Sequence, residues 1–170
     1  WLYQEGSSRI FPDAWEGFLA PIPVAERSDL VSAYHKRLTS EDEAVRHEAA
    51  LAWSIWEGST SRLIPDPEMV ARTAEPVFAA AFARIECHYF VNKGFFEDNQ
   101  LLRDIDRVRH IPTVIIQGRY DVVCPPKSAW DLHRAFPEAK LVLVPDAGHS
   151  ARESGIQQAL LEATLRFGKG

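Results

Sequence analysis

Hydrophobic and polar residues follow one pattern over the first part of the chain and another over the last part. Up to about residue 104, apolar residues recur every three to four positions, which is the period of an α-helix. From about residue 105, short continuous apolar runs end in turn residues, a pattern typical of strands buried in a parallel sheet. The sequence therefore predicts a helical domain over residues 1–104 and an α/β domain over residues 105–170.

The helical part carries recognisable start and stop signals. The first predicted helix begins at Pro12, and the second spans Val24–Leu38. The third runs from the capping box Ser40–Glu43 to about Glu57. The fourth runs from Asp66-Pro67 to Phe90 with a break at Glu75-Pro76, and the last spans Leu101–Val108. Gly58 is expected to end the third of these helices, because glycine is common just after a helix C-terminus.

Two apolar runs in the α/β part, Val114–Ile116 and Leu141–Val144, predict buried strands. Residues Pro126–Phe136 between them have helical spacing. A strand, a helix and a second strand in this order imply a right-handed parallel crossover. A final helix is predicted over Ile156–Phe167 and would cover one face of the sheet.

One residue suited to acid–base chemistry follows each predicted strand: Asp121 follows the first and His149 the second. Since ligands of open α/β sheets bind at the carboxyl ends of the strands, we expect these two side chains to meet there. A histidine can take a proton from a hydroxyl nucleophile, and an aspartate can fix its tautomer. Taken singly, Asp121 could cap a turn and His149 could lie in a surface loop. Together, in this strand context, they predict the last two members of a Ser–Asp–His triad.

Five segments carry a family resemblance. They are GRYDVVCP and PDAGHS around Asp121 and His149, and WLYQEGSSRIFPDAWE, WSIWEG and RIECHYF further upstream. These segments resemble those of proline iminopeptidases, which are α/β-hydrolase serine exopeptidases, and the likeness covers essentially the whole chain. The resemblance implies the C-terminal part of an α/β-hydrolase fold, with an all-helical cap over residues 1–104 before the core residues 105–170. It also implies a peptide substrate with a free N-terminal proline.

The same resemblance implies substrate-binding roles for two glutamates. Glu57 and Glu86 match cap glutamates that bind the free α-amino group of the substrate. Their positions alone favour the alternative that both are solvated glutamates on helix surfaces. Cys87 follows Glu86 where the family pattern leads us to expect an amide residue, so the match is imperfect at this point.

Four aromatic residues could line a pocket for a flat apolar ring such as that of proline, although such residues are more often core: Trp56, Phe90, Phe95 and Tyr120. Cys124 lies three positions after Asp121. Related enzymes have a cysteine near the site here, which can make them sensitive to thiol reagents. We do not expect Cys124 to be the nucleophile, because no histidine is close in sequence and Pro125 follows it.

The chain lacks two parts that α/β-hydrolase chemistry requires. No serine lies in a G-x-S-x-G nucleophile elbow, and no H-G-G-P-like stretch is present for an oxyanion hole. The family order places both upstream of Trp1, and the only methionine is Met69. We therefore expect a portion of a longer enzyme, with the N-terminal half as its missing partner. Without a nucleophile, this chain alone is predicted to be inactive.

Composition argues against several other classes. The net charge of −5, with no basic patch, argues against a nucleic-acid partner. No apolar run reaches membrane-spanning length and no signal peptide opens the chain, so we expect no membrane partner and a cytoplasmic setting. Two cysteines do not make a disulfide framework, and the six histidines lack metal-binding spacing, so neither a metal nor a cofactor is predicted.

The sequence thus favours a serine aminopeptidase that releases N-terminal proline. One alternative is another α/β-hydrolase, such as an esterase, an epoxide hydrolase or a dehalogenase. A second alternative is a non-catalytic helical binding module with the α/β end as its scaffold. The identity of the upstream nucleophile, serine or aspartate, separates the first two, and peptide binding without cleavage would favour the third.

Overall fold

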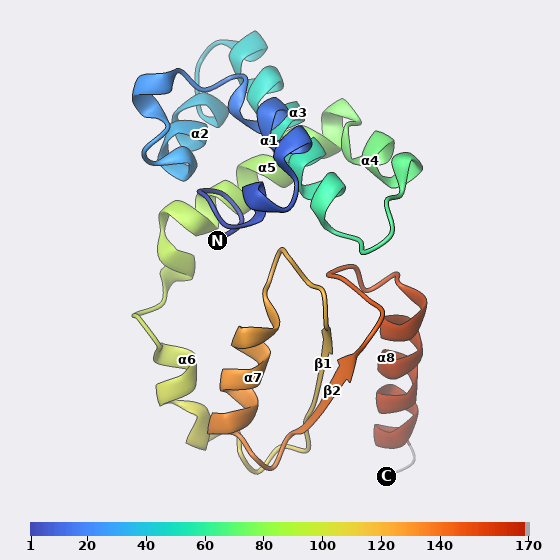
Figure 1. The fold of residues 1–170 in the computed structure, drawn as a ribbon. Coiled ribbons are helices and arrows are strands. Elements are labelled where there is room, and N and C mark those ends of the chain that lie inside the picture. Colours follow the sequence, from blue (N-terminus) through green and yellow to red (C-terminus); the bar gives the residue numbers. More distant parts are fainter. Residues whose placement is uncertain (169–170) are drawn as a thin grey trace. The chain divides into compact units, whose positions relative to one another are not determined.

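The structure is a computed structural model that describes residues 1–168. The chain divides into two compact units: Trp1–Thr60 with Pro65–Phe96, and Ser61–Ile64 with the residues from Glu97 onward. We call the first the helical unit and the second the α/β unit, and describe each by itself (Figure 1). The division at residue 104 into cap and core stays a prediction.

The helical unit consists of helices joined by short connections. They are α1 (Pro12–Leu19), α2 (Leu30–Leu38), α3 (Glu43–Thr60), α4 (Pro67–Thr73) and α5 (Pro76–Val91), with 3-10 turns at Ser7–Arg9, Val24–Glu26 and Lys93–Phe95. Helix α3 contacts each of the other four α-helices, so it organises the unit. Two expected helix boundaries are confirmed: Asp66 accepts a hydrogen bond from the backbone N–H of Met69 at 3.0 Å, and α5 begins at Pro76.

Two other predicted helix boundaries are wrong. The helix expected from Val24 begins only at Leu30, because the Asp29 side chain accepts from the N–H of Ser32 at 3.1 Å and caps it there. Helix α3 is capped by Asp42, whose Oδ1 accepts from the N–H of Ala44 at 2.8 Å, and not by the predicted box starting at Ser40.

Gly58 does not end α3, which continues to Thr60. A Cβ atom at Gly58 would lie 2.6 Å from Oγ1 of Thr73 and 3.3 Å from Cα of Val70. The glycine therefore serves the close approach of α4 to α3, which a sequence pattern cannot distinguish from a helix stop.

The core of the helical unit is aromatic. Its largest fully buried side chains are those of Trp53, Trp56, Tyr34 and Phe18. The rings of Phe18 and Tyr34 stack with centroids 4.6 Å apart, and the indole N–H of Trp56 donates to the carbonyl oxygen of Leu2 at 3.2 Å. Trp56 is therefore a core residue, and the suggestion that it lines a substrate pocket is wrong.

The α/β unit contains two strands and their flanking helices. Its elements are α6 (Gln100–Arg103), a 3-10 turn at Ile105–Arg107, β1 (Val114–Gly118), α7 (Pro126–Ala135), β2 (Lys140–Val144) and α8 (Ser154–Phe167). The strands pair in parallel, with Val114 opposite Lys140 and Gly118 opposite Val144, which confirms that the connection through α7 is a parallel crossover. The helix expected over Leu101–Val108 is shorter than predicted, because the chain leaves α6 at Asp104.

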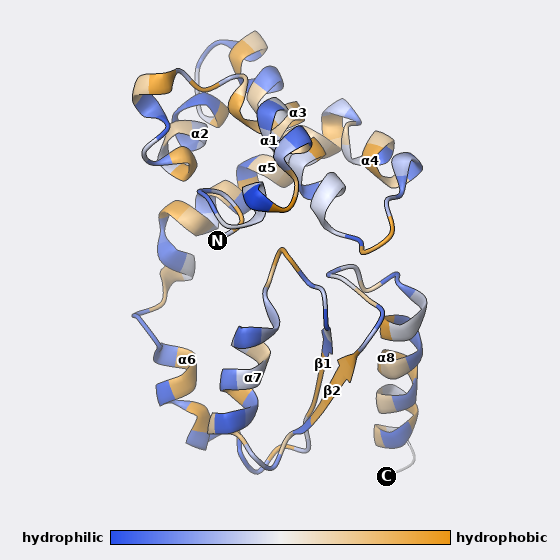
Figure 2. Cartoon of the chain, in the orientation of Figure 1, coloured by the Kyte–Doolittle hydropathy of each residue, from blue (hydrophilic) through white to orange (hydrophobic). Residues whose placement is uncertain are grey.

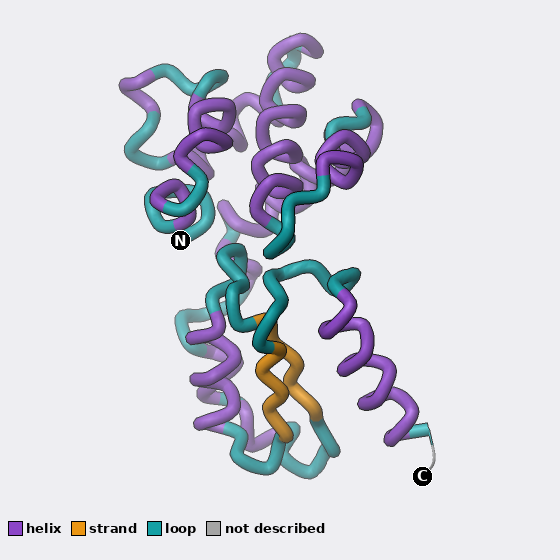
Figure 3. Tube along the Cα trace, turned by 45° about the vertical axis from the view of Figure 1, so that its right-hand side comes forward, coloured by secondary structure: helices purple, strands orange, loops and turns teal. Residues whose placement is uncertain are grey.

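Helices α7 and α8 lie on opposite sides of the two-stranded sheet (Figures 1 and 3). Val144, Ala147 and Ile156 form the buried cluster between the sheet and α8. Figure 2 shows that β2 is hydrophobic over most of its length, whereas α7 presents many hydrophilic residues. In the part of the chain that the structure describes, no helix combines the length and the apolar character needed to cross a membrane.

Candidate active site

The carboxyl ends of β1 and β2 bring two loops into direct contact. The backbone N–H of Arg119 donates to the carbonyl oxygen of Val144 at 2.8 Å, and that of Tyr120 donates to Ala147 at 3.0 Å. A Cβ atom at Gly118 would lie 1.9 Å from the carbonyl oxygen of Gly148. Only glycine allows this approach, so Gly118 is what lets the loop after β1 close against the loop after β2.

This contact places Asp121 beside His149. Oδ2 of Asp121 lies 2.9 Å from Nδ1 of His149, a hydrogen-bonding distance. Asp121 is only 7 % exposed, whereas the His149 side chain keeps 38 % of its surface accessible. The sequence prediction that these two side chains meet at one sheet edge is confirmed by this distance, while their catalytic roles stay predictions.

Three further donors fix the Asp121 carboxylate. Its Oδ1 accepts from the backbone N–H groups of Val123 at 3.0 Å and Cys124 at 2.8 Å. Its Oδ2 also accepts from Nε2 of Gln117 at 3.0 Å. With the histidine, the carboxylate has four partners and one orientation, as a residue that must hold an imidazole requires. Sequence analysis missed Gln117, because a glutamine near a strand end carries no distinctive signal.

The hydrogen bond that His149 donates to the Asp121 carboxylate raises the pKa of His149 from 6.5 to about 10, with a smaller contribution from Cys124. The carboxylate stabilises the imidazolium, which is the form that His149 takes when it has accepted a proton. The contribution of Cys124 also means that its thiol lies at the imidazole. His149 is therefore near Cys124 in space although no histidine is close to it in sequence, and Cys124 itself is exposed.

A buried glutamate holds the His149 loop. Glu153 is 8 % exposed, and its carboxylate accepts from the N–H of Gly148 at 2.9 Å and the N–H of Leu63 at 3.2 Å. The carbonyl oxygen of Ser61 in turn accepts from the N–H groups of His149 at 3.2 Å and Ser150 at 2.8 Å. The Ser61–Ile64 segment, far upstream in sequence, is thus bonded to the histidine loop within the α/β unit. Sequence analysis missed Glu153, because it looks like an ordinary acidic residue before a helix.

In the helical unit, a stacked aromatic pair connects Glu57 with Glu86. The rings of Tyr3 and Trp53 stack with centroids 4.3 Å apart. The Tyr3 hydroxyl donates to Oε1 of Glu57, and the Trp53 indole N–H donates to Oε2 of Glu86 at 3.0 Å. Glu57 is 6 % exposed, so the alternative that it is a solvated surface glutamate is wrong; Glu86 is half-buried.

The remaining aromatic candidates have separate surroundings. Phe90 lies against the stacked pair, with its ring centroid 5.1 Å from that of Tyr3, and stays partly exposed. Phe95 contacts His88 and Tyr89 and is exposed, as is Tyr120 in the α/β unit. Phe90 is therefore the one of these three that the structure brings to the glutamate cluster.

The described residues 1–168 contain no group of three histidine, cysteine, aspartate or glutamate side chains placed to hold a metal ion. The chemistry that these residues can support is acid–base chemistry at His149, oriented by Asp121. The buried carboxylate of Glu57 is suited to a cation, because a charge in such surroundings is stabilised by an opposite charge or by hydrogen-bond donors.

Comparison with known proteins identifies the fold family. The family model of the alpha/beta hydrolase fold matches residues 4–155. A probable proline iminopeptidase of Leptolyngbya boryana is 64 % identical over 168 residues, which cover 98 % of this chain and 52 % of the relative. Proline iminopeptidases of Xylella fastidiosa and Arabidopsis thaliana are 60 % and 56 % identical, over 98 % of this chain and 54 % and 44 % of their own lengths.

The chain spans about half the length of the curated relatives that it matches. The family match covers most of the chain, and the parallel strands with flanking helices after a helical region are the architecture expected for it. The chain belongs to the α/β-hydrolase fold family.

Proposed function

We propose that this chain is the C-terminal part of a serine aminopeptidase that releases N-terminal proline from peptides. The observation that carries the proposal is the 2.9 Å contact between Nδ1 of His149 and Oδ2 of Asp121 at the ends of two parallel strands. This is the arrangement of the last two triad members in serine hydrolases. The names of the relatives support proline as the residue that is released.

In the proposed reaction, a serine hydroxyl from the N-terminal half attacks the carbonyl carbon of the N-terminal proline. His149 takes the hydroxyl proton as general base and then gives it to the leaving amine as general acid. Asp121 holds the Nδ1–H side of the ring, so that Nε2 is the nitrogen available to the hydroxyl. Water then hydrolyses the acyl-enzyme, and His149 acts as base a second time.

The glutamate cluster of the helical unit is proposed to bind the substrate α-amino group. Glu57 is buried and receives a hydrogen bond from Tyr3, while Glu86 receives one from Trp53. Two carboxylates joined through one stacked aromatic pair form a site for a cation flanked by flat apolar surface. A protonated N-terminal proline has both features, and internal peptide bonds have neither. Tyr120 and Cys124 are proposed to contact the substrate beside His149.

We further propose that residues 1–104 form the cap and residues 105–170 part of the core, with the N-terminal half as the partner that completes the site. The 170-residue chain alone should therefore show no turnover, because it contains no nucleophile elbow. Both cysteines are free, which supports a reducing, cytoplasmic setting.

The catalytic assignment is tested with the His149→Ala variant of the full-length enzyme. Cleavage of a proline arylamide should fall by at least about 10⁴-fold, because the general base is lost. His110→Ala is the matched control, since His110 is exposed and lies outside the site, and its activity should equal that of the wild type. Retained activity in His149→Ala would refute the assignment, and an aspartate at the upstream nucleophile position would favour another α/β-hydrolase.

The amine-binding role is tested with Glu57→Gln. We expect kcat/KM to fall by about 10- to 100-fold on substrates with a free amine, because one charged hydrogen bond is lost. An N-blocked proline ester should lose much less. Glu68→Gln on the exposed face of α4 is the control. Equal losses on blocked and free substrates would rule out amine recognition by Glu57.

A further inference from the structure

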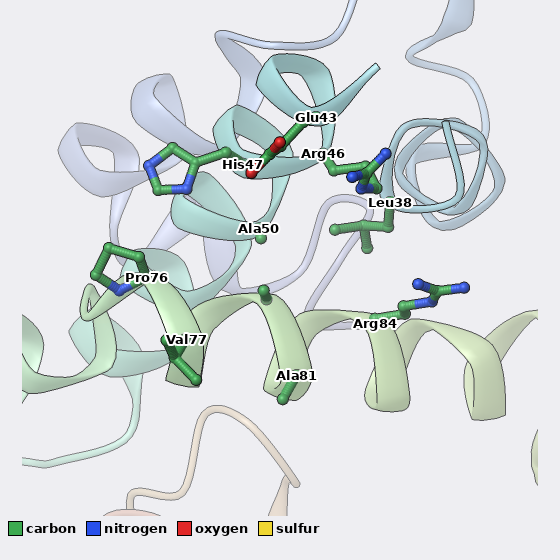
Figure 4. Close-up of a pocket in the computed structure, with 10 residues that line it drawn as sticks. Leu38, Glu43, Arg46, His47, Ala50, Pro76, Val77, Ala81 and Arg84 are labelled. Carbon is green, nitrogen blue, oxygen red and sulfur yellow. The ribbon is translucent and has the colours of Figure 1, made fainter. Parts of the chain in front are cut away.

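The helical unit contains a pocket of about 540 Å³ that shares no lining residue with the glutamate cluster. It lies mainly between the N-terminal half of α3 and the first turns of α5 (Figure 4). Arg46 in this pocket precedes Glu57 by eleven positions on α3, which is about 16 Å along the helix axis. The pocket is therefore a separate feature, and its volume is in the usual range for sites that bind small molecules.

The floor of the pocket is apolar and its edge is mainly basic. The apolar lining comes from Leu38, Ala50, Pro76, Val77, Ala80 and Ala81. The polar lining comes from Arg46, His47, Arg84 and a single acidic residue, Glu43. Figure 4 shows Arg46 and Arg84 extending toward the same end of the pocket, where Leu38 lies between them. This concentration of cationic side chains contrasts with the net charge of −5 of the chain.

The two arginines differ in what they already bind. Nη1 of Arg46 donates to the carbonyl oxygens of Ser40 at 2.7 Å and Glu41 at 2.9 Å, which fixes its guanidinium at the pocket edge. Within residues 1–168, the guanidinium of Arg84 forms no hydrogen bond or ion pair. A second, smaller pocket of about 280 Å³ adjoins the first through Leu38 and Arg84, and adds His35 and His88 to its lining. Arg84 therefore lies between the two pockets, and its guanidinium N–H groups are available to a ligand.

We propose that this pocket binds an amphipathic carboxylate, with an aliphatic chain on the alanine-rich floor and the carboxylate held by Arg84 and Arg46. A planar guanidinium matches a carboxylate with two parallel hydrogen bonds, and a second guanidinium nearby strengthens the attraction. The aliphatic part removes the exposed surface of Val77, Ala80 and Ala81 from water. A neutral ligand of the same length would make only the apolar contacts. A short carboxylate such as acetate would make only the hydrogen bonds to the guanidinium groups.

Binding is measured by calorimetry on the full-length protein, independently of peptidase activity. Decanoate, below its micelle concentration, is expected to bind one molecule per chain. Decanol and acetate should each bind at least about tenfold more weakly, because each lacks one half of the recognition. Absence of decanoate binding, or equal binding of decanol, would overturn the proposal.

Four variants test where decanoate binds, and they are expected to change its affinity in different directions. Arg84→Gln should weaken decanoate binding at least about tenfold, whereas Glu43→Gln should tighten it, because a like charge is removed from the edge. Ala81→Phe should block the pocket by bulk without changing any charge. Arg9→Gln, an exposed arginine of the same unit outside the pocket, is the control and should bind as the wild type does.

None of these residues belongs to the proposed catalytic or amine-binding groups, so all four variants should retain the wild-type peptidase rate. Unchanged affinity in both Arg84→Gln and Ala81→Phe would show that decanoate binds elsewhere, and the proposal would then be wrong. A variant that loses binding because it is unfolded is recognised by a melting temperature well below that of Arg9→Gln.

Discussion

Nδ1 of His149 and Oδ2 of Asp121 lie 2.9 Å apart although the two residues are 28 positions apart in sequence. The contact follows from the register of the sheet, in which Gly118 at the end of β1 is opposite Val144 at the end of β2. Both loops therefore leave the same edge at the same level. Two five-residue strands are enough to position an acid–base pair, because parallel strands bring their carboxyl ends together.

Replacing Asp121 with asparagine should lower the pKa of His149 from about 10 toward 6.5, because the hydrogen bond to Asp121 is the main cause of the shift. The titration is followed through the side-chain nitrogens of His149 by NMR on the full-length protein. We also expect kcat to fall by about 10³- to 10⁴-fold, since asparagine does not stabilise the correct tautomer. An unchanged pKa would mean that Asp121 does not control the histidine.

The same pair makes stability depend on pH in a defined direction. The pKa of His149 is raised to about 10 in the folded state, so the stabilisation is fully present below pH 6.5 and is lost as the pH rises through 10. The difference in unfolding free energy between wild type and Asp121→Asn should therefore be largest near pH 6 and shrink toward pH 10. Solvent reduces its size, since the His149 side chain is partly exposed. Denaturant titrations at several pH values measure it, and a difference that grows with pH would contradict this explanation.

Gly118→Ala should separate the two loops. The added Cβ would lie 1.9 Å from the carbonyl oxygen of Gly148, and backbone atoms cannot move aside as a flexible side chain can. We expect an unfolding free energy lower by more than about 3 kcal/mol, or an enzyme without activity if it folds. Gly17→Ala in α1 is the control, because nothing lies within 4 Å of a Cβ there. Wild-type activity in Gly118→Ala would show that the close approach is not required.

Elements with strong local signals could be predicted from the sequence. The apolar runs around Ile115 and Val142 and the helical spacing between them determine a parallel crossover, and Asp66-Pro67 determines a helix start. Helix boundaries were less predictable where tertiary contacts decide. Gly58 has the local chemistry of a helix stop, but α4 packs on it and α3 continues.

The candidate site was predictable only in its principal members. Asp121 and His149 each follow a predicted strand, and this position identified them as candidates. Gln117, Glu153 and Tyr3 support those members through hydrogen bonds that depend on tertiary structure. Each is a common residue type in an ordinary local setting, so no sequence pattern distinguishes it.

Trp56→Ala should reduce stability without changing substrate preference. Trp56 is completely buried and its indole N–H is bonded to Leu2, so we expect a loss of about 3–5 kcal/mol in unfolding free energy. Trp130→Ala on the partly exposed face of α7 should cost under about 1 kcal/mol. Thermal and denaturant unfolding measure both effects. A change in KM for proline substrates at unchanged stability would instead support the earlier hypothesis that Trp56 lines the substrate pocket.

Glu153→Gln tests whether the buried carboxylate holds the histidine loop. The glutamate accepts from two backbone N–H groups, those of Gly148 and Leu63, with one oxygen each. Glutamine keeps the shape but presents an NH₂ group to one of these donors, which leaves that buried N–H without an acceptor. We expect an unfolding free energy lower by about 1–3 kcal/mol, shifted amide resonances for Gly148 and Leu63, and a lower kcat with little change in KM.

Glu162→Gln on the exposed face of α8 is the matched control and should change none of these. If Glu153→Gln has the resonances and the stability of the wild type, the loop is held by its other backbone hydrogen bonds, to Ser61 and Tyr120, and the carboxylate has no part in positioning His149.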